Sequence, residues 1–343
     1  GSGGSWQFAD NYTSEGANIT LTAGILDTNG KTLTGVGILN SSGGVTRTLT
    51  LGASTVNLNI WNTATITNLT FNANTSTIAF SGGGTGSFFQ SNTLTFNNVT
   101  LSATSGNGYI FPVNTMTFAN LTVTGGTIKT AFISISANYT VSSTLTINGN
   151  SSINRVLITS DTRGILRTLT AATVTMTNVD LKDITGAGAG SWDLSAITGG
   201  SGDCGGNSGI TFTTADENFW IGGTGNWSTA GEWSQTSGGA ANGRVPLPQD
   251  DAIFDANSFS AGSLTVTQDM PRAGKNINWT GVTNTPTWTT STVASIFGSL
   301  TLVSGMTLTA STQTYTFEGR STFTLTNAGK TWAKAITLDA PGG

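Results

Sequence analysis

The chain of 343 residues has no histidine and one cysteine, Cys204. The absence of histidine excludes Ser-His-Asp and Cys-His nucleophilic systems in their usual form, and histidine metal sites. A lone cysteine cannot form an intrachain disulfide or supply a thiolate metal cluster. These absences exclude most familiar catalytic and metal-binding arrangements.

Charge is also scarce. Charged residues make up 9% of the chain and the net charge is −4, whereas about a quarter of the residues of an ordinary domain are charged. The basic residues are scattered singly, so nothing predicts binding to nucleic acid or to an anionic membrane. No run of about 18 apolar residues is present, and we therefore expect no membrane insertion.

Glycine, serine, threonine and asparagine supply the polarity instead. Apolar residues alternate with threonine and asparagine, as in half-buried strands, and no segment keeps a helical period. Clusters of glycine and asparagine at 81–84, 106–108 and 148–150 suit tight corners, because these residues tolerate positive φ. The pattern predicts an all-β fold.

A short phrase recurs: threonine, an apolar residue, any residue, asparagine, an apolar residue. It stands at 65–69, 95–99, 117–121 and 175–179. A repeat of roughly 20 to 30 residues cannot bury its own core, so the repeats must stack. We predict a β-solenoid, in the simplest form a right-handed parallel β-helix, with the asparagines stacked as an amide ladder. A series of β-sandwiches is the alternative.

Composition changes near residue 200. The glycine-rich run 199–207 is typical of a junction, and seven of the nine tryptophans lie at or beyond Trp192. We predict a β-helix repeat domain over 1–210 and a second, tryptophan-rich all-β module with further strand repeats over 211–343. The chain starts at Gly1 without an initiator methionine, which we interpret as a piece of a longer polypeptide.

Three tryptophans, Trp220, Trp227 and Trp233, are closely spaced among glycines. If exposed, they could stack on the sugar rings of a cell-surface glycan, because an indole face offers a rigid apolar surface. We take them as the candidate ligand-binding residues. The alternative is that they form the core of a small module.

Asp250, Asp251 and Asp255 form the one dense carboxylate group. Calcium prefers six to eight oxygen ligands, so these residues could supply part of a shell, and calcium is the one cofactor that the sequence suggests. Their spacing matches neither the EF-hand nor the glycine-rich calcium repeat. Roles in turns or helix caps are the alternative.

Glycan cleavage is the enzymatic alternative, and it normally needs two carboxylates. No aspartate or glutamate lies between Asp27 and Asp161. Further on, Asp180 and Lys182 should share the outer face of a strand by alternation, as a surface ion pair or, alternatively, as part of an active site. We expect no enzymatic activity.

Thr-x-Thr also recurs, as at 93–95, 115–117 and 144–146. Flat rows of threonine on a β-helix are one way in which proteins bind ice. The irregular spacing of the repeats would break a lattice match, and β-propensity explains the pattern more simply.

The phrase at 95–101 resembles the Thr/Asn/Gly-rich β-helical repeats of tailed-phage virions and bacterial surface proteins. The tryptophan and glycine pattern at 219–228, with 232–234 and 248–255, is similar to a module of large bacterial adhesins. The resemblance implies a virion or extracellular location. It suggests a structural and adhesive part of a phage virion (tail fibre, spike or decoration protein), working as a homo-oligomer or within a larger assembly. A bacterial adhesin or filament subunit and a polysaccharide depolymerase are the alternatives.

Overall fold

The computed structural model describes residues 3–80, 89–103, 108–111, 114–309 and 313–341. Almost all of its regular structure is strand, and the described residues include one short 3-10 helix, η1 (Ala230–Glu232). The strands stack in parallel as a β-solenoid of about 14 turns, which confirms the predicted fold class. A helix long and apolar enough to cross a membrane is absent from these ranges. The right-handed winding stays a prediction, based on the usual hand of parallel crossovers.

The chain divides into two compact units. Unit 1 comprises Gly1–Val179, Asp183–Asp193 and Ser208–Thr211. Unit 2 comprises Asp180–Lys182, Leu194–Asn207 and Phe212–Gly343. Each unit has its own stack of strands, and each is described separately below.

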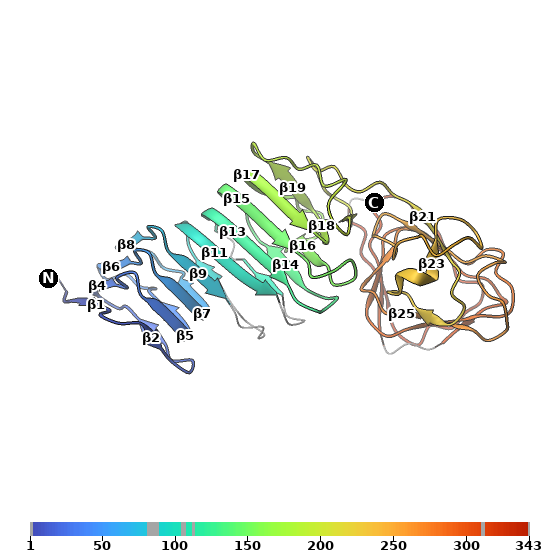
Figure 1. Ribbon diagram of the computed structural model, residues 1–343, viewed down its shortest axis with the longest axis horizontal. Helices are drawn as coiled ribbons and strands as arrows, with labels where there is room; N and C mark the ends of the chain where they lie inside the picture. Colours follow the sequence, from blue (N-terminus) through green and yellow to red (C-terminus); the bar gives the residue numbers. More distant parts are fainter. Residues whose placement is uncertain (1–2, 81–88, 104–107, 112–113, 310–312, 342–343) are drawn as a thin grey trace. The chain divides into compact units, whose positions relative to one another are not determined.

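Unit 1 is built on one long parallel sheet, to which successive turns of the chain contribute strands (Figure 1). Its strands are β2 (Tyr12–Thr13), β3 (Ile19–Thr20), β5 (Thr32–Asn40), β7 (Thr55–Thr63), β9 (Thr77–Phe80), β10 (Phe89–Ser91), β11 (Thr95–Ala103), β13 (Thr117–Gly125), β15 (Tyr139–Asn148), β17 (Arg167–Thr177) and β19 (Ile184–Ala187). The opposite side of each turn is formed by shorter strands: β1 (Ser5–Gln7), β4 (Gly24–Asp27), β6 (Arg47–Thr50) and β8 (Leu69–Asn72), then β12 (Tyr109–Ile110), β14 (Phe132–Ile135) and β16 (Val156–Ser160). Because each turn pairs in parallel with the next, the alternative of antiparallel sandwiches is wrong.

The core of unit 1 consists of columns of like side chains. Leu101 of β11 lies beside Val123 of β13, which lies beside Ile147 of β15. All three are buried, and burial of each such side chain contributes about 1.5–3 kcal/mol. Alternation within a strand therefore fixes which face is buried, and parallel register repeats that choice in the next turn.

Irregular repeat lengths are absorbed outside these columns. The register of β15 shifts between Val141 and Thr144 where it pairs with β17, and that of β13 shifts between Phe118 and Asn120. Bulges of this kind take up extra residues without disturbing the pairing on either side. The turns consequently stay in register although the sequence phrase recurs at uneven intervals.

The asparagines of the recurring phrase occupy two kinds of position. Asn120 Nδ2 donates to Asn98 Oδ1 at 2.9 Å, so the predicted amide ladder is present there. Asn68 and Asn178 instead adopt the left-handed conformation, with φ of 56° and 50°. For these two the ladder prediction is wrong, because the phrase falls at a corner that asparagine tolerates better than most residues.

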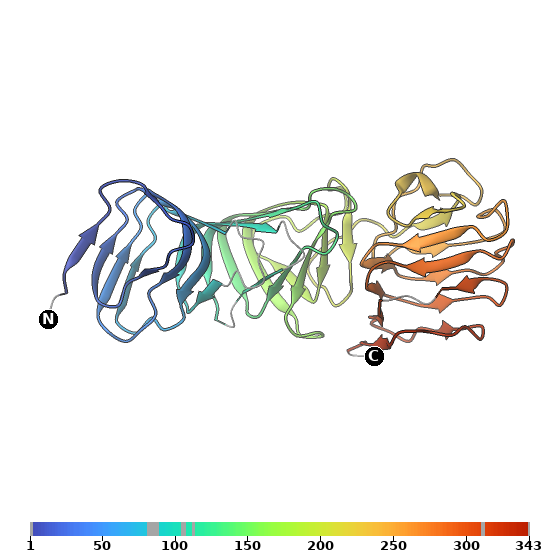
Figure 2. The ribbon, with the colours of Figure 1, turned by 90° about the horizontal axis from the view of Figure 1, so that it is seen from below.

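Unit 2 is a second solenoid, in which each full turn contributes one strand to each of three sheets (Figure 2). The first sheet contains β21 (Glu217–Trp220), β23 (Trp233–Ser234), β24 (Asp251–Ile253), β27 (Ile277–Asn278), β30 (Leu300–Thr301) and β33 (Leu325–Thr326). The second contains β22 (Gly225–Asn226), β25 (Thr265–Gln268), β28 (Thr287–Thr290) and β31 (Thr307–Leu308), and the third contains β26 (Arg272–Gly274), β29 (Ala294–Ile296), β32 (Tyr315–Phe317) and β34 (Ile336–Leu338). The segments Asp180–Lys182 and Leu194–Asn207 of this unit carry most of β18 (Val179–Lys182) and all of β20 (Ser201–Asp203).

Aromatic rings run through the core of unit 2. Phe254 stacks on Trp279 with ring centroids 3.8 Å apart, and Trp279 contacts Trp288 at 5.7 Å. The column continues to Tyr315, whose ring lies edge-on to Trp288. A column of large planar side chains therefore fills the centre of this solenoid, whereas aliphatic residues predominate in the core of unit 1.

Candidate functional site

The three candidate sugar-binding tryptophans lie in the first turn of unit 2. Trp220 and Trp233 face each other across the antiparallel pair β21–β23, with ring centroids 5.1 Å apart, and Trp227 packs on Trp233 at 5.0 Å. All three have an exposed fraction of 0%. The prediction that they form a sugar-stacking surface is wrong, because a ring must be exposed to stack on a sugar. They cover the end of the aromatic core instead.

The glycines around these tryptophans are part of the pattern that suggested a ligand-binding segment, and the structure gives them a packing role. A Cβ at Gly222 would lie 1.1 Å from the Glu232 carboxylate, so this position has no room for a side chain. Trp220 Nε1 donates to the carbonyl of Gly223 at 3.1 Å. The spacing of glycine and tryptophan serves close packing of a tight first turn.

Asp250, the first of the three candidate calcium ligands, is fully buried in a structural role. Its Oδ1 accepts from Arg244 Nη2 at 2.6 Å, and its Oδ2 accepts from the Leu247 amide at 2.8 Å. It also accepts from the Asp216 amide at 3.0 Å. Its carboxylate therefore fixes the loop before β24.

The carboxylates of Asp251 and Asp255 have different hydrogen-bond partners and different structural roles. Asp251 Oδ1 accepts from Asn276 Nδ2 at 2.8 Å, which joins two successive turns. Asp255 Oδ1 accepts from the Asn257 amide at 2.9 Å and caps a turn. In the part of the chain that the structure describes, no three His, Cys, Asp or Glu side chains are grouped so as to hold a metal ion. The predicted calcium shell is wrong, and the alternative of turn roles describes these residues better.

The expected surface pair of Asp180 and Lys182 is also wrong, because both side chains are buried and have other partners. Arg272 Nε donates to Asp180 Oδ2. Lys182 Nζ donates to Glu318 Oε2 at 2.8 Å, and Ser295 Oγ donates to the other oxygen of Glu318 at 2.8 Å. Strand β18 is buried on both of its faces, so alternation does not place its polar residues in solvent.

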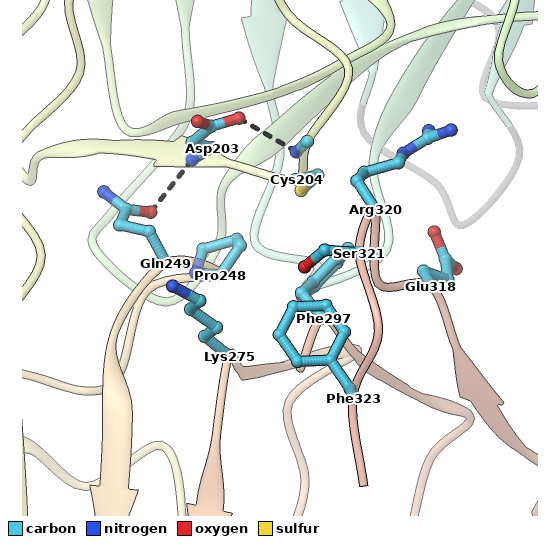
Figure 3. A pocket seen from close by; sticks show the side chains of 11 residues that line it. Asp203, Cys204, Pro248, Gln249, Lys275, Phe297, Glu318, Arg320, Ser321 and Phe323 are labelled. Carbon is cyan, nitrogen blue, oxygen red and sulfur yellow. Dashed lines mark hydrogen bonds between the residues drawn. The ribbon is translucent and has the colours of Figure 1, made fainter. Parts of the chain in front are cut away.

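Glu318, a member of one of these buried pairs, lines a pocket of about 280 Å³ in unit 2, and Figure 3 shows the side chains around it. Its lining residues are Asp203, Cys204, Gly205, Pro248, Gln249, Lys275, Phe297, Glu318, Arg320, Ser321 and Phe323. The Asp203 carboxylate accepts from the Gly205 amide at 2.9 Å and from Asn207 Nδ2 at 2.7 Å. Both carboxylates of the pocket, Asp203 and Glu318, therefore have hydrogen-bond partners within the chain.

The Cys204 thiol lies beside this charge cluster and is buried. Burial raises the pKa of the thiol well above its ordinary value, and the nearby Asp180 carboxylate raises it further. A thiol that stays protonated is a poor nucleophile. The arrangement therefore gives Cys204 a packing role.

We expect Cys204 to resist alkylation in the folded chain and to react once unit 2 unfolds. At about pH 8.5 a free thiol is half ionised, whereas the folded thiol stays protonated. Because the folded pKa is the higher one, this group favours the folded state below the unfolded pKa, and that preference is lost as pH rises toward the folded pKa. Mass spectrometry after iodoacetamide treatment, with and without urea, measures the reaction. Cys204→Ser controls for labelling elsewhere, and rapid labelling without urea would contradict the expectation.

Sequence reasoning missed Arg272 and Glu318 as partners of the buried charges. They lie 92 and 136 residues from Asp180 and Lys182. No local pattern connects positions so far apart, although the scarcity of charge makes each charged residue a candidate for a specific partner.

Comparisons of the chain with protein families, with curated proteins and with solved structures find no match.

Proposed function

We propose that this chain is a non-enzymatic structural and adhesive component of a phage virion, such as a tail fibre, spike or decoration protein. The observation that carries the proposal is the stacking of parallel turns within each of the two units, about 14 turns in all. In such a stack each turn is hydrogen-bonded to its neighbours, which suits a rigid shaft. The resemblance of residues 95–101 to virion and bacterial-surface β-helical repeats supports the same reading.

The distribution of charge agrees with a structural role. Two ion pairs, Asp180–Arg272 and Lys182–Glu318, are buried, and in each of them the two side chains contact one another. Charged residues are few in the rest of the chain. A shaft with a weak electrostatic field does not attract ions or polymers unspecifically. The location that we propose is the virion or another extracellular surface.

Assembly with further subunits is part of the proposal. In unit 1, β1 is exposed along its length, and the exposed fraction of Trp6 is 74%. In unit 2, Leu338 of β34 has an exposed fraction of 76%. Exposed strands with apolar side chains pair readily with other chains, so we propose a homo-oligomer or a larger assembly.

Electron microscopy with gold-labelled antibodies against the chain tests the proposal. The samples are purified virions and intact cells from the culture whose DNA encodes the chain. We expect label on virions, and portal or tail genes beside the coding sequence. Label confined to the cell envelope would contradict the virion assignment and favour an adhesin or filament subunit. Shortening of capsular polysaccharide by the purified chain would contradict the non-enzymatic role and favour a depolymerase.

A further inference from the structure

The outer face of the long sheet in unit 1 carries an ordered array of short polar side chains. Its central column is formed by Thr100, Thr122, Thr146 and Thr175, from β11, β13, β15 and β17. Each of these residues pairs with the next in parallel register, so their side chains point to the same side. All four are partly or well exposed.

Two further columns flank the central one at a distance of two residues along each strand. One runs from Asn98 to Thr173, and the other runs from Ser102 to Thr177. Every position in the three columns is threonine, serine or asparagine. The array therefore presents hydroxyl, methyl and amide groups, with no charged group among them.

Three of the four hydroxyls in the central column are available to a ligand, whereas that of Thr100 donates to the Ile78 carbonyl at 3.5 Å. In the ranges that the structure describes, those of Thr122, Thr146 and Thr175 have no hydrogen-bond partner within the chain. Threonine is also stiff at χ1, so its hydroxyl and methyl keep their direction without a large loss of entropy on binding.

The spacing of the array is close to that of ice. Neighbouring strands lie about 4.8 Å apart, and alternate residues of a strand lie about 6.7 Å apart. In tetrahedrally bonded water each O–H···O link spans about 2.75 Å, which places next-nearest oxygens about 4.5 Å apart and gives a repeat of about 7.3 Å along the hexagonal axis. The difference between the strand spacing and the 4.5 Å oxygen spacing accumulates to about 1 Å across four strands. Small side-chain rotations can absorb a difference of this size.

The objection raised by the irregular repeats does not hold for this face. The register shifts of β13 and β15 lie before Asn120 and Thr144, outside the three columns. The columns themselves are continuous from β11 to β17. The extra residues of the longer repeats therefore leave the array regular.

A glycan fits this face less well than ice. Aromatic side chains are the usual platforms for sugar rings. The aromatic residues of these strands, Phe96, Phe118 and Tyr139, are buried on the inner side of the sheet. The outer face of these columns offers hydroxyl, methyl and amide groups, without a ring on which a sugar could stack.

We propose that the threonine array on β11, β13, β15 and β17 binds the surface of ice crystals. Hydroxyls and amides replace water positions of the lattice, while the threonine methyls fill the spaces between them. This proposal does not depend on the virion assignment, because the array would act in the same way on any extracellular shaft.

Partition into slowly growing ice tests the proposal with the full chain, beside serum albumin as a protein that ice excludes. We expect the chain to enter the ice and to lower the freezing point below the melting point. Thr146→Lys and Thr146→Tyr should each abolish both effects, because a long or bulky side chain at the centre holds the lattice away. The matched control is Thr70→Lys on β8, an exposed strand position outside the array, which should behave as the unchanged chain.

Circular dichroism and urea unfolding establish that each variant is folded. Exclusion of the unchanged chain from ice would overturn the proposal. So would equal partition of the folded Thr146 variants, since the array would then not be the contact. Retention of the chain on microcrystalline cellulose or chitin, lost in the Thr146 variants and without entry into ice, would overturn it in favour of a crystalline glycan.

Discussion

Replacement of Trp233 by alanine is expected to lower the free energy of unfolding of unit 2 by about 3–5 kcal/mol, the usual cost of removing a large buried aromatic side chain. Trp233 contacts Trp220, Trp227 and Phe254 with ring centroids between 5.0 and 5.8 Å apart. A cavity at this site would expose the end of the aromatic column to water. Urea unfolding followed by tryptophan fluorescence measures the change.

The control for Trp233→Ala is Val293→Ala in the same unit, because Val293 has an exposed fraction of 47%. Substitution at such a surface position should change the free energy by no more than about 0.5 kcal/mol. A similarly small change for Trp233→Ala would contradict the closed aromatic core. It would return the three tryptophans to consideration as ligand-binding residues.

The second large effect on stability is expected at the buried ion pair between Asp180 and Arg272. Asp180→Asn should lower the free energy of unfolding of unit 2 by about 3–5 kcal/mol, because it leaves the Arg272 guanidinium buried without its counter-charge. Asp180 is fully buried, and a Cβ at Gly202 would lie 2.0 Å from its carboxylate, so the space around it cannot relax easily. The urea midpoint of unit 2 reports the loss.

Two variants make this result interpretable. Asp161→Asn removes one partner of the more exposed pair with Arg167, which joins atoms 2.9 Å apart; we expect a change of about 0–1 kcal/mol there. The double variant Asp180→Leu, Arg272→Met removes both buried charges and should recover much of the lost stability. If the double variant is no more stable than Asp180→Asn alone, the isolated charge is not the cause.

The sequence predicted the fold class because the signals for it are local. Alternation of apolar and polar residues, as in β11 and β13, selects strands, and glycine or asparagine at corners supplies the positive φ that the turns need. The recurring phrase also predicted the contact between Asn98 and Asn120. It could not separate these two from Asn68 and Asn178, since the same five-residue pattern is compatible with a strand and with a corner.

The candidate site could not be predicted in the same way. Glycine and tryptophan close together are compatible with an exposed platform and with a tightly packed turn. The choice depends on whether another ring covers them; here Phe254 does so, and it stacks in turn on Trp279. Likewise, the sequence showed Asp250 as one of a group of carboxylates, but it did not show that Arg244 pairs with it. The Arg244 guanidinium supplies the positive charge that a metal ion would otherwise have supplied.

By itself, then, the sequence determined what depends on composition and on neighbours along the chain: strands, corners, the scarcity of charge and the absence of histidine chemistry. The tertiary structure decided what depends on stacking. It brought Asp180 to Arg272 and Lys182 to Glu318, across 92 and 136 residues, and buried all four. It also placed the bulges outside the threonine columns and so made a regular array from irregular repeats. The physical reason is that register belongs to pairs of strands, and a pair of strands is defined only when the turns are stacked.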